Sequence, residues 1–144
     1  MAAPPLTNLS WNTGTVKASF DVLLEPGAEF WHEWRDQAGP YQVGPCIRFK
    51  DGAFFVGQEQ VCAAPTGKWL HVELDCPLGA GTEAGTFTVS LTADAGQTTL
   101  FAGTGKLGSA KWRSLNCLVW VSNATTASEF YLDNVRYERI RPAK

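Results

Sequence analysis

The sequence predicts an all-β fold, a two-sheet antiparallel β-sandwich, on three observations. Apolar and polar residues alternate along four separate segments, as in strands that bury one face. Turn residues separate these segments, and the 14 glycines and 8 prolines leave stretches too short for most helices. A chain of 144 residues with 44% hydrophobic residues can also bury one sizeable core. We therefore expect a single domain over residues 1–144, with its ordered core at about 15–140.

The alternation is clearest at residues 16–24, 70–76, 86–92 and 116–121. In the first three segments, apolar residues alternate with lysine, glutamate, serine or threonine, which predicts one buried and one outward face. In the fourth we assign Cys117, Val119 and Val121 to the core and Trp120 to the outward face.

Turn chemistry divides the strands at Glu25-Pro26-Gly27, Asp51-Gly52, Thr66-Gly67 and Asp94-Ala95-Gly96. The Asp51-Gly52 pair predicts a β-hairpin that joins residues 46–50 to 53–56. Near the end of the chain, the apolar parity moves from Phe130 and Leu132 to Val135 and Tyr137. This extra residue predicts a β-bulge at Asp133-Asn134.

Composition excludes several functions. A net charge of −2 with only 18% charged residues argues against nucleic-acid binding, which needs a dense basic face. No apolar run approaches the roughly 20 residues of a membrane span. The start at Met1, with Pro4 and Pro5 close behind, indicates no secretion signal and suggests a fragment of a larger protein. We expect the isolated domain to be monomeric.

Two stretches resemble a known group of domains. Residues 130–135, Phe-Tyr-Leu-Asp-Asn-Val, resemble the closing strand of jelly-roll domains appended to polysaccharide-degrading enzymes. Residues 67–74 resemble the Gly-x-Trp-x-x-Val strand of concanavalin-like and laminin-G-like sandwiches, which favours a core or rim position for Trp69. The resemblance implies a non-catalytic carbohydrate-binding module, secreted or extracytoplasmic, beside the catalytic domain of a larger parent enzyme. It implies no required cofactor, although such domains often hold a structural calcium, for which Asp133 is the candidate ligand. The other interpretation is that Asp133 accepts hydrogen bonds from backbone donors freed by the bulge.

The best binding candidate is the segment at residues 29–36. A glycan site needs an aromatic ring for the apolar face of a sugar, flanked by planar polar groups for its hydroxyls. One parity of this segment shows Glu29, Trp31, Glu33 and Arg35, and the other shows the more core-like Phe30, His32 and Trp34. If neighbouring strands join this sheet, outward residues from them complete the site. Trp112 is a further stacking candidate. The predicted ligand-binding residues are Trp31, Glu33, Arg35, Arg48, His71, Glu73 and Trp120.

Arginine in this set suits a carboxylated or sulfated polysaccharide. Two alternatives remain open. One is a glycoside hydrolase or lyase that uses Glu29 and Glu33, which lie four residues apart and therefore roughly 13 Å apart on one face of a strand. The other is a structural or protein-docking sandwich without a glycan. The four cysteines, of which Cys76 and Cys117 share core parity, form either disulfides or free thiols.

Overall fold

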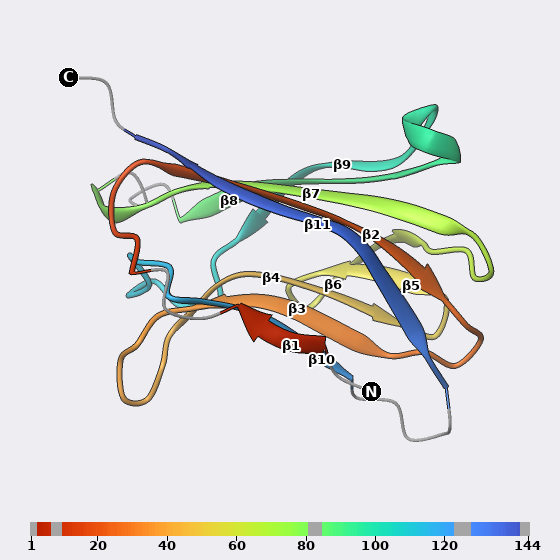
Figure 1. Cartoon of the computed structure of the whole chain (residues 1–144), viewed down its shortest axis with the longest axis horizontal. Coiled ribbons are helices and arrows are strands. Elements are labelled where there is room, and N and C mark those ends of the chain that lie inside the picture. The colour runs from red at the N-terminus through yellow and green to blue at the C-terminus, as the bar shows by residue number, and fades with distance from the viewer. Residues whose placement is uncertain (1–2, 7–9, 81–84, 123–127, 142–144) are drawn as a thin grey trace.

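The computed structural model describes residues 3–6, 10–80, 85–122 and 128–141, which form two antiparallel sheets packed face to face (Figure 1). One sheet has six strands, in the order β1 (Ala3–Leu6), β10 (Cys117–Ser122), β3 (Phe30–Arg35), β4 (Val43–Lys50), β5 (Ala53–Val56) and β6 (Glu59–Ala63). The other has five, in the order β11 (Phe130–Ile140), β2 (Thr15–Leu24), β7 (Trp69–Pro77), β8 (Thr86–Ala93) and β9 (Thr98–Lys106). A 3-10 turn, η2 (Asp94–Gly96), joins β8 to β9. No helix in these residues is long and apolar enough to cross a membrane.

The predicted sandwich is confirmed, and strand alternation explains it. Along β2, alternate residues Val16, Phe20 and Val22 are completely buried, while Lys17 on the opposite parity is exposed. The strands β7 and β8 follow the same pattern. Burying one face of each sheet against the other removes these apolar side chains from water, at about 25 cal/mol per Å² of apolar area.

The predicted hairpin is also present. Asp51 and Gly52 both have positive φ angles, 52° and 70°, as a two-residue type I′ turn requires. This turn pairs β4 with β5, with Lys50 opposite Ala53.

The bulge in β11 lies at the predicted place. Asp133 pairs with Asp21 and Arg136 pairs with Ser19, so three steps along β11 match two steps along β2. Asn134 has a positive φ of 50°, and its backbone N–H donates to Asp133 Oδ1 at 2.8 Å. Asp133 therefore does accept from a backbone donor at the bulge.

The parity of β10 is the reverse of the prediction. Leu118 and Trp120 are buried at 1% and 3% exposure, and Cys117 lies opposite Arg35 on the outer face. Of the predicted core residues of this strand, Val119 alone is buried, at 6% exposure. The assignment was wrong because both parities of this strand are apolar, so alternation did not distinguish them. The four cysteines are free thiols.

Trp112, a predicted stacking residue, is fully buried instead, so that prediction was wrong. Its ring lies 6.4 Å from the Trp34 ring, and a Cβ at Gly44 would collide with it. Gly44 therefore leaves the space that the Trp112 indole occupies.

The core contains one histidine with both ring nitrogens paired. His32 Nδ1–H donates to the Val119 carbonyl at 2.9 Å, and Trp34 Nε1–H donates to His32 Nε2 at 3.0 Å. The imidazole also stacks on Trp120, with ring centroids 4.5 Å apart. Complete burial lowers the pKa of His32 to about 3, so the ring is neutral.

Candidate functional site

The outer face of the six-stranded sheet carries the predicted segment with the predicted parity. Phe30, His32 and Trp34 have no exposed surface and face the core. The alternate residues of β3 therefore point outward. Register then adds neighbours to them, because Trp31 lies opposite Arg48 on β4 and Arg48 lies opposite Phe55 on β5. We call this surface the Trp31 face; it consists of Trp31, Glu33, Arg35, Arg48 and Phe55.

The centre of the Trp31 face is a row of aromatic, cationic and aromatic side chains on three adjacent strands. The Arg48 guanidinium lies 4.9 Å from the Phe55 ring centroid, within the range of a cation–π contact. The Trp31 indole is half-buried on the other side of Arg48. Such a row offers flat apolar surfaces beside a fork of N–H donors.

An ion pair between Arg35 and Glu33 lies beside this row. Arg35 Nε donates to Glu33 Oε2 at 3.0 Å, and the Glu33 side chain is only 10% exposed. The Arg35 guanidinium also lies 4.3 Å from the ring centroid of the exposed Tyr41. Because Arg35 neutralises Glu33, the Trp31 face keeps one net positive charge, that of Arg48.

Two donors on the Trp31 face are buried without a partner among the described residues. These are Trp31 Nε1 and Arg48 Nε, on neighbouring strands. A buried donor without an acceptor costs about 1–3 kcal/mol.

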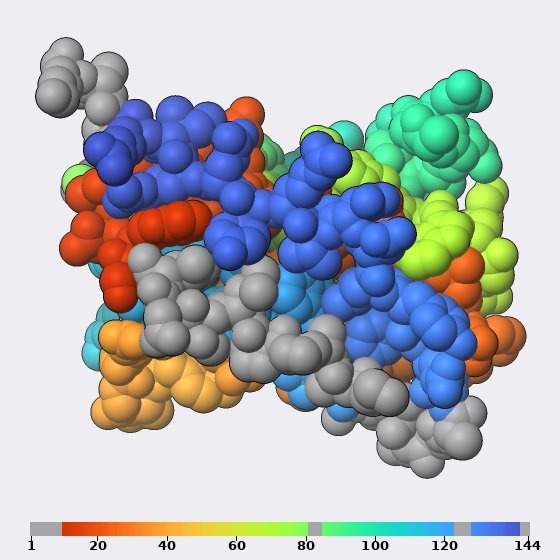
Figure 2. Space-filling view, in the orientation of Figure 1, coloured from red at the N-terminus to blue at the C-terminus, as the bar shows by residue number. Residues whose placement is uncertain are grey.

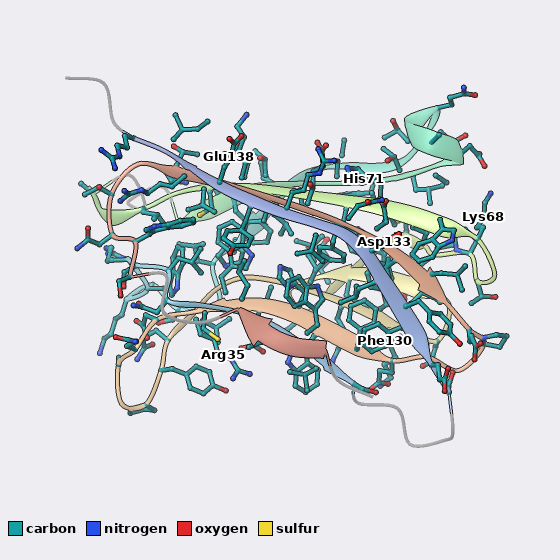
Figure 3. All side chains as sticks on the ribbon, viewed as in Figure 1. Arg35, Lys68, His71, Phe130, Asp133 and Glu138 are labelled. Atoms are coloured by element: carbon teal, nitrogen blue, oxygen red, sulfur yellow. The ribbon has the colours of Figure 1, made fainter. Side chains whose placement is uncertain are left out.

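The other predicted residues do not join the Trp31 face. His71 lies on β7, in the five-stranded sheet, and faces the opposite side of the sandwich from Arg35 (Figure 3). Glu73 lies two residues further along β7, on the same face as His71. The expectation that they neighbour Arg48 was wrong, because strand alternation identifies a face but not the sheet that a strand joins. Trp120 is in the core, and Trp69 is 46% exposed and not a core or rim residue as expected.

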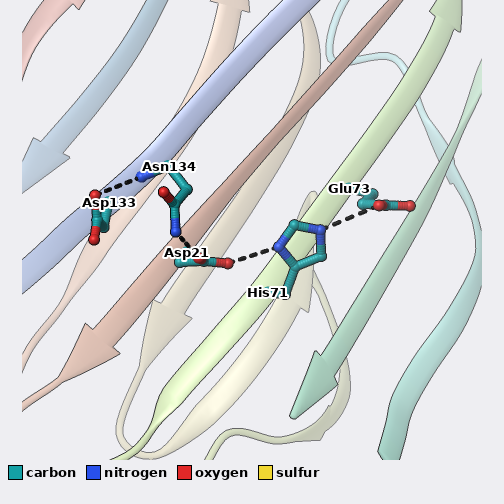
Figure 4. Close-up of polar contacts among 5 residues, drawn as sticks. All are labelled: Asp21, His71, Glu73, Asp133 and Asn134. Atoms are coloured by element: carbon teal, nitrogen blue, oxygen red, sulfur yellow. Dashed lines mark hydrogen bonds and ion pairs between the residues drawn. The ribbon is translucent and has the colours of Figure 1, made fainter. Parts of the chain in front are cut away.

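His71 belongs to a polar network of its own (Figure 4). Its Nδ1 lies 2.7 Å from Asp21 Oδ1 and its Nε2 lies 3.1 Å from Glu73 Oε1. Partial burial by itself would lower the pKa of His71, but the hydrogen bonds to these two carboxylates outweigh it. The net effect is a pKa above the usual value of histidine. Asn134 Nδ2 donates to Asp21 Oδ2 at 2.6 Å, which ties the bulge to the network.

Phe55 and Tyr41 were missed in the sequence. Phe55 had a usable signal, because it follows Asp51-Gly52 at a distance that places it opposite Arg48 in a two-residue hairpin. Tyr41 had none, because it lies in the loop between β3 and β4.

The metal prediction at Asp133 gains no further ligands in the described part of the chain. No group of three or more histidine, cysteine, aspartate or glutamate side chains there could hold an ion. The Asp133 carboxylate accepts a hydrogen bond from the backbone N–H of Asn134.

Comparison with known proteins identifies the fold but no family. No protein-family model matches the sequence, and no curated protein matches it. The catalytic domain of the glycoside hydrolase family 131 protein from Coprinopsis cinerea has a TM-score of 0.59 at 12% identity, over 98% of this chain and 65% of that one. A tetrameric galectin from the ball sponge Cinachyrella sp. has a TM-score of 0.55 at 6% identity, over 93% and 97%. Peanut lectin has a TM-score of 0.51 at 13% identity, over 93% and 75%.

These similarities define the class as a jelly-roll β-sandwich of the kind found in lectins and in a glycoside hydrolase domain. The chain spans about 65% of the glycoside hydrolase domain that it resembles. At such low identity the shared property is the fold.

Proposed function

We propose that the protein is a non-catalytic carbohydrate-binding module that binds a polysaccharide through the Trp31 face. The observation that carries this proposal is the row of Trp31, Arg48 and Phe55 on three neighbouring strands. Sugars present apolar C–H faces and hydroxyl edges, and the row offers aromatic surface and N–H donors side by side. Lectins named among the structural neighbours support sugar binding on this fold.

Arg48 gives the proposal its substrate preference. Its side chain forms no ion pair among the described residues, whereas Arg35 is held by Glu33. A guanidinium that is not neutralised by a carboxylate favours a carboxylated or sulfated sugar, because its planar fork matches those oxyanions. The polymer we propose is therefore acidic.

The charges around the two candidate catalytic carboxylates support binding without cleavage. Glu33 accepts from Arg35, and Glu29 Oε1 lies 3.8 Å from Lys50 Nζ. Each carboxylate thus already has a cationic partner within the protein, and in this arrangement neither is held ready to contact a glycosidic oxygen. We propose that the parent protein is larger, extracytoplasmic, and supplies any catalytic domain.

The test is affinity electrophoresis in native gels that contain neutral laminarin, xylan or galactan, or acidic alginate, pectin or carrageenan. We expect an acidic gel to retard the wild type. Stacking on an aromatic ring contributes about 1–3 kcal/mol by analogy with base stacking, and a charge-assisted contact about 1.5–3 kcal/mol. Trp31→Ala and Arg48→Ala should therefore each weaken retention at least tenfold.

Arg139→Ala is the matched control. Arg139 also contacts an aromatic ring, with its guanidinium 5.7 Å from the Trp11 centroid, but it lies in the five-stranded sheet. This variant should retain the wild-type mobility shift. Retardation by none of the six polymers would refute the proposal and leave the protein-docking alternative. Reducing ends or unsaturated products that disappear with Glu33→Gln would establish an enzyme instead.

A further inference from the structure

The outer face of the five-stranded sheet is hollowed by a groove that lies away from the Trp31 face. Its volume is about 630 Å³, within the roughly 300–1,000 Å³ typical of small-ligand sites. In Figure 2 the top of the molecule, which is this outer face, dips between β11 and the turn at η2. We call it the Ser19 groove; its polar lining includes Lys17, Ser19, Glu73, Asp75, Ser90 and Arg136.

Strand register explains why this surface is hollow. One row across the sheet is Arg136, Ser19, Glu73 and Ser90, and the next is Glu138, Lys17, Asp75 and Thr88. Short hydroxyl side chains therefore form the floor between longer charged ones. The bulge in β11 sets this register, because its extra residue brings Arg136 opposite Ser19.

Several polar side chains of the groove have fixed positions and still expose atoms that a ligand can reach. His71 binds Glu73 Oε1, which fixes the position of this carboxylate, yet its side chain is 65% exposed. Lys17 and Asp75 form an exposed ion pair at 3.5 Å. The side chains of Ser19, Ser90 and Arg136 form no hydrogen bond within the described residues.

The charge pattern of the groove selects the class of ligand. Lys17 and Arg136 contribute two positive charges, and Glu73, Asp75 and Glu138 three negative ones, so neighbouring groups alternate in sign. Alternating donors and acceptors suit hydroxyl groups, which both donate and accept, better than they suit an anion or a cation. Tyr137 adds no aromatic wall, because it pairs with the buried Ala18 and its ring packs on Trp11, on the opposite side of β11 from Arg136 and Glu138.

From this geometry we propose that the Ser19 groove is a second binding site, which takes a neutral sugar unit of a glycan. It stands on the groove alone and does not require the Trp31 face to bind. If both faces bind, one domain holds two glycan chains on opposite sides of the sandwich.

The test is a titration of ¹⁵N-labelled protein with cellobiose, lactose and mannobiose, and separately with glucuronate and cadaverine, followed by amide chemical shifts. We expect at least one neutral disaccharide to shift the amides of Ser19, Glu73 and Ser90 saturably. Ser90→Leu, which fills the floor and removes a hydroxyl, should weaken this binding at least tenfold. Arg136→Gln on the exposed terminal strand should weaken it severalfold without disturbing the fold.

Thr99→Leu is the matched control, because Thr99 is exposed on the same face, opposite Thr92, but does not line the groove. It should bind within twofold of the wild type. No saturable shift at the groove with any neutral disaccharide, or shifts with glucuronate or cadaverine only, would overturn the inference. Shifts confined to the Trp31 face would overturn it while supporting the proposed function, and full binding by Ser90→Leu would also overturn it.

Discussion

Acidification from pH 7.5 to 5.0 should destabilise the fold mainly through His32. Burial lowers the pKa of this imidazole to about 3, against 6.5 for an ordinary histidine. Between these two pH values the unfolded chain binds a proton at His32 that the folded chain does not. The stabilisation is therefore complete above pH 6.5 and is lost as the pH falls toward 3.

The expected loss follows from the two pKa values. Below pH 6.5 the free energy of unfolding should fall by up to about 1.4 kcal/mol per pH unit. Integrated from pH 7.5 to 5.0, the loss is about 2 kcal/mol, or roughly a thirtyfold change in the unfolding equilibrium. The lower limit of pH 5.0 keeps the measurement above the usual range of the carboxyl groups.

The assay is urea unfolding at several pH values, followed by tryptophan fluorescence with the thiols kept reduced. It is best done with His71→Asn, because the chain has two histidines and this variant leaves only His32. His71 acts with the opposite sign. Although its partial burial lowers the pKa, its carboxylate partners raise it overall, so its stabilisation is present below pH 6.5 and is lost as the pH rises through the folded pKa.

A free energy of unfolding that stays constant within about 0.5 kcal/mol from pH 7.5 to 5.0 would refute this reasoning. It would mean that His32 takes up a proton in the folded protein. The ¹⁵N shifts of the imidazole give an independent reading, and they should report the neutral ring with a proton on Nδ1 at pH 5.0.

Three further outcomes follow from packing, burial and backbone geometry. Gly44→Ala should destabilise the fold by about 1–3 kcal/mol in urea unfolding, because its Cβ would meet the buried Trp112 ring. In native protein, iodoacetamide followed by mass spectrometry should label Cys62 well before Cys76, because burial, with the Asp75 charge, raises the pKa of Cys76 to about 12; equal rates would contradict this. Asn134→Ala should lower the melting temperature, because alanine tolerates a positive φ less well and cannot donate the hydrogen bond to Asp21. Asn134→Gly should lower the melting temperature by less, because glycine adopts a positive φ without strain.

The sequence alone correctly predicted the buried face of those strands in which only one parity carries polar residues. β2 and β7 were predicted correctly because charged residues on one parity can face only water. The buried face of β3 was also predicted correctly, since Phe30 and Trp34 outweigh His32 in apolar character. The hydrogen-bond partners of His32 are Trp34 and the Val119 carbonyl, which lies on a strand distant in sequence.

Prediction failed where the deciding information lies between strands. In β10 both parities are apolar, and its register with β3, which sets Trp120 opposite the buried His32, places Trp120 in the core. His71 was placed on the wrong side of the molecule because its sheet is set by long-range pairing with β2 and β8. The Trp31–Arg48 neighbours were correctly grouped, because β3 and β4 are consecutive in the chain and pair directly.

The bulge in β11 also bears on the solubility of the protein. β11 is an 11-residue strand at the end of its sheet, and a straight terminal strand of that length is a template for pairing with another molecule. The bend at Asp133-Asn134 interrupts the row of backbone groups, and the charged Arg136, Glu138 and Arg139 follow directly along the strand. Deleting Asn134 would straighten this strand, and the chain would then be expected to aggregate through it before losing its fold.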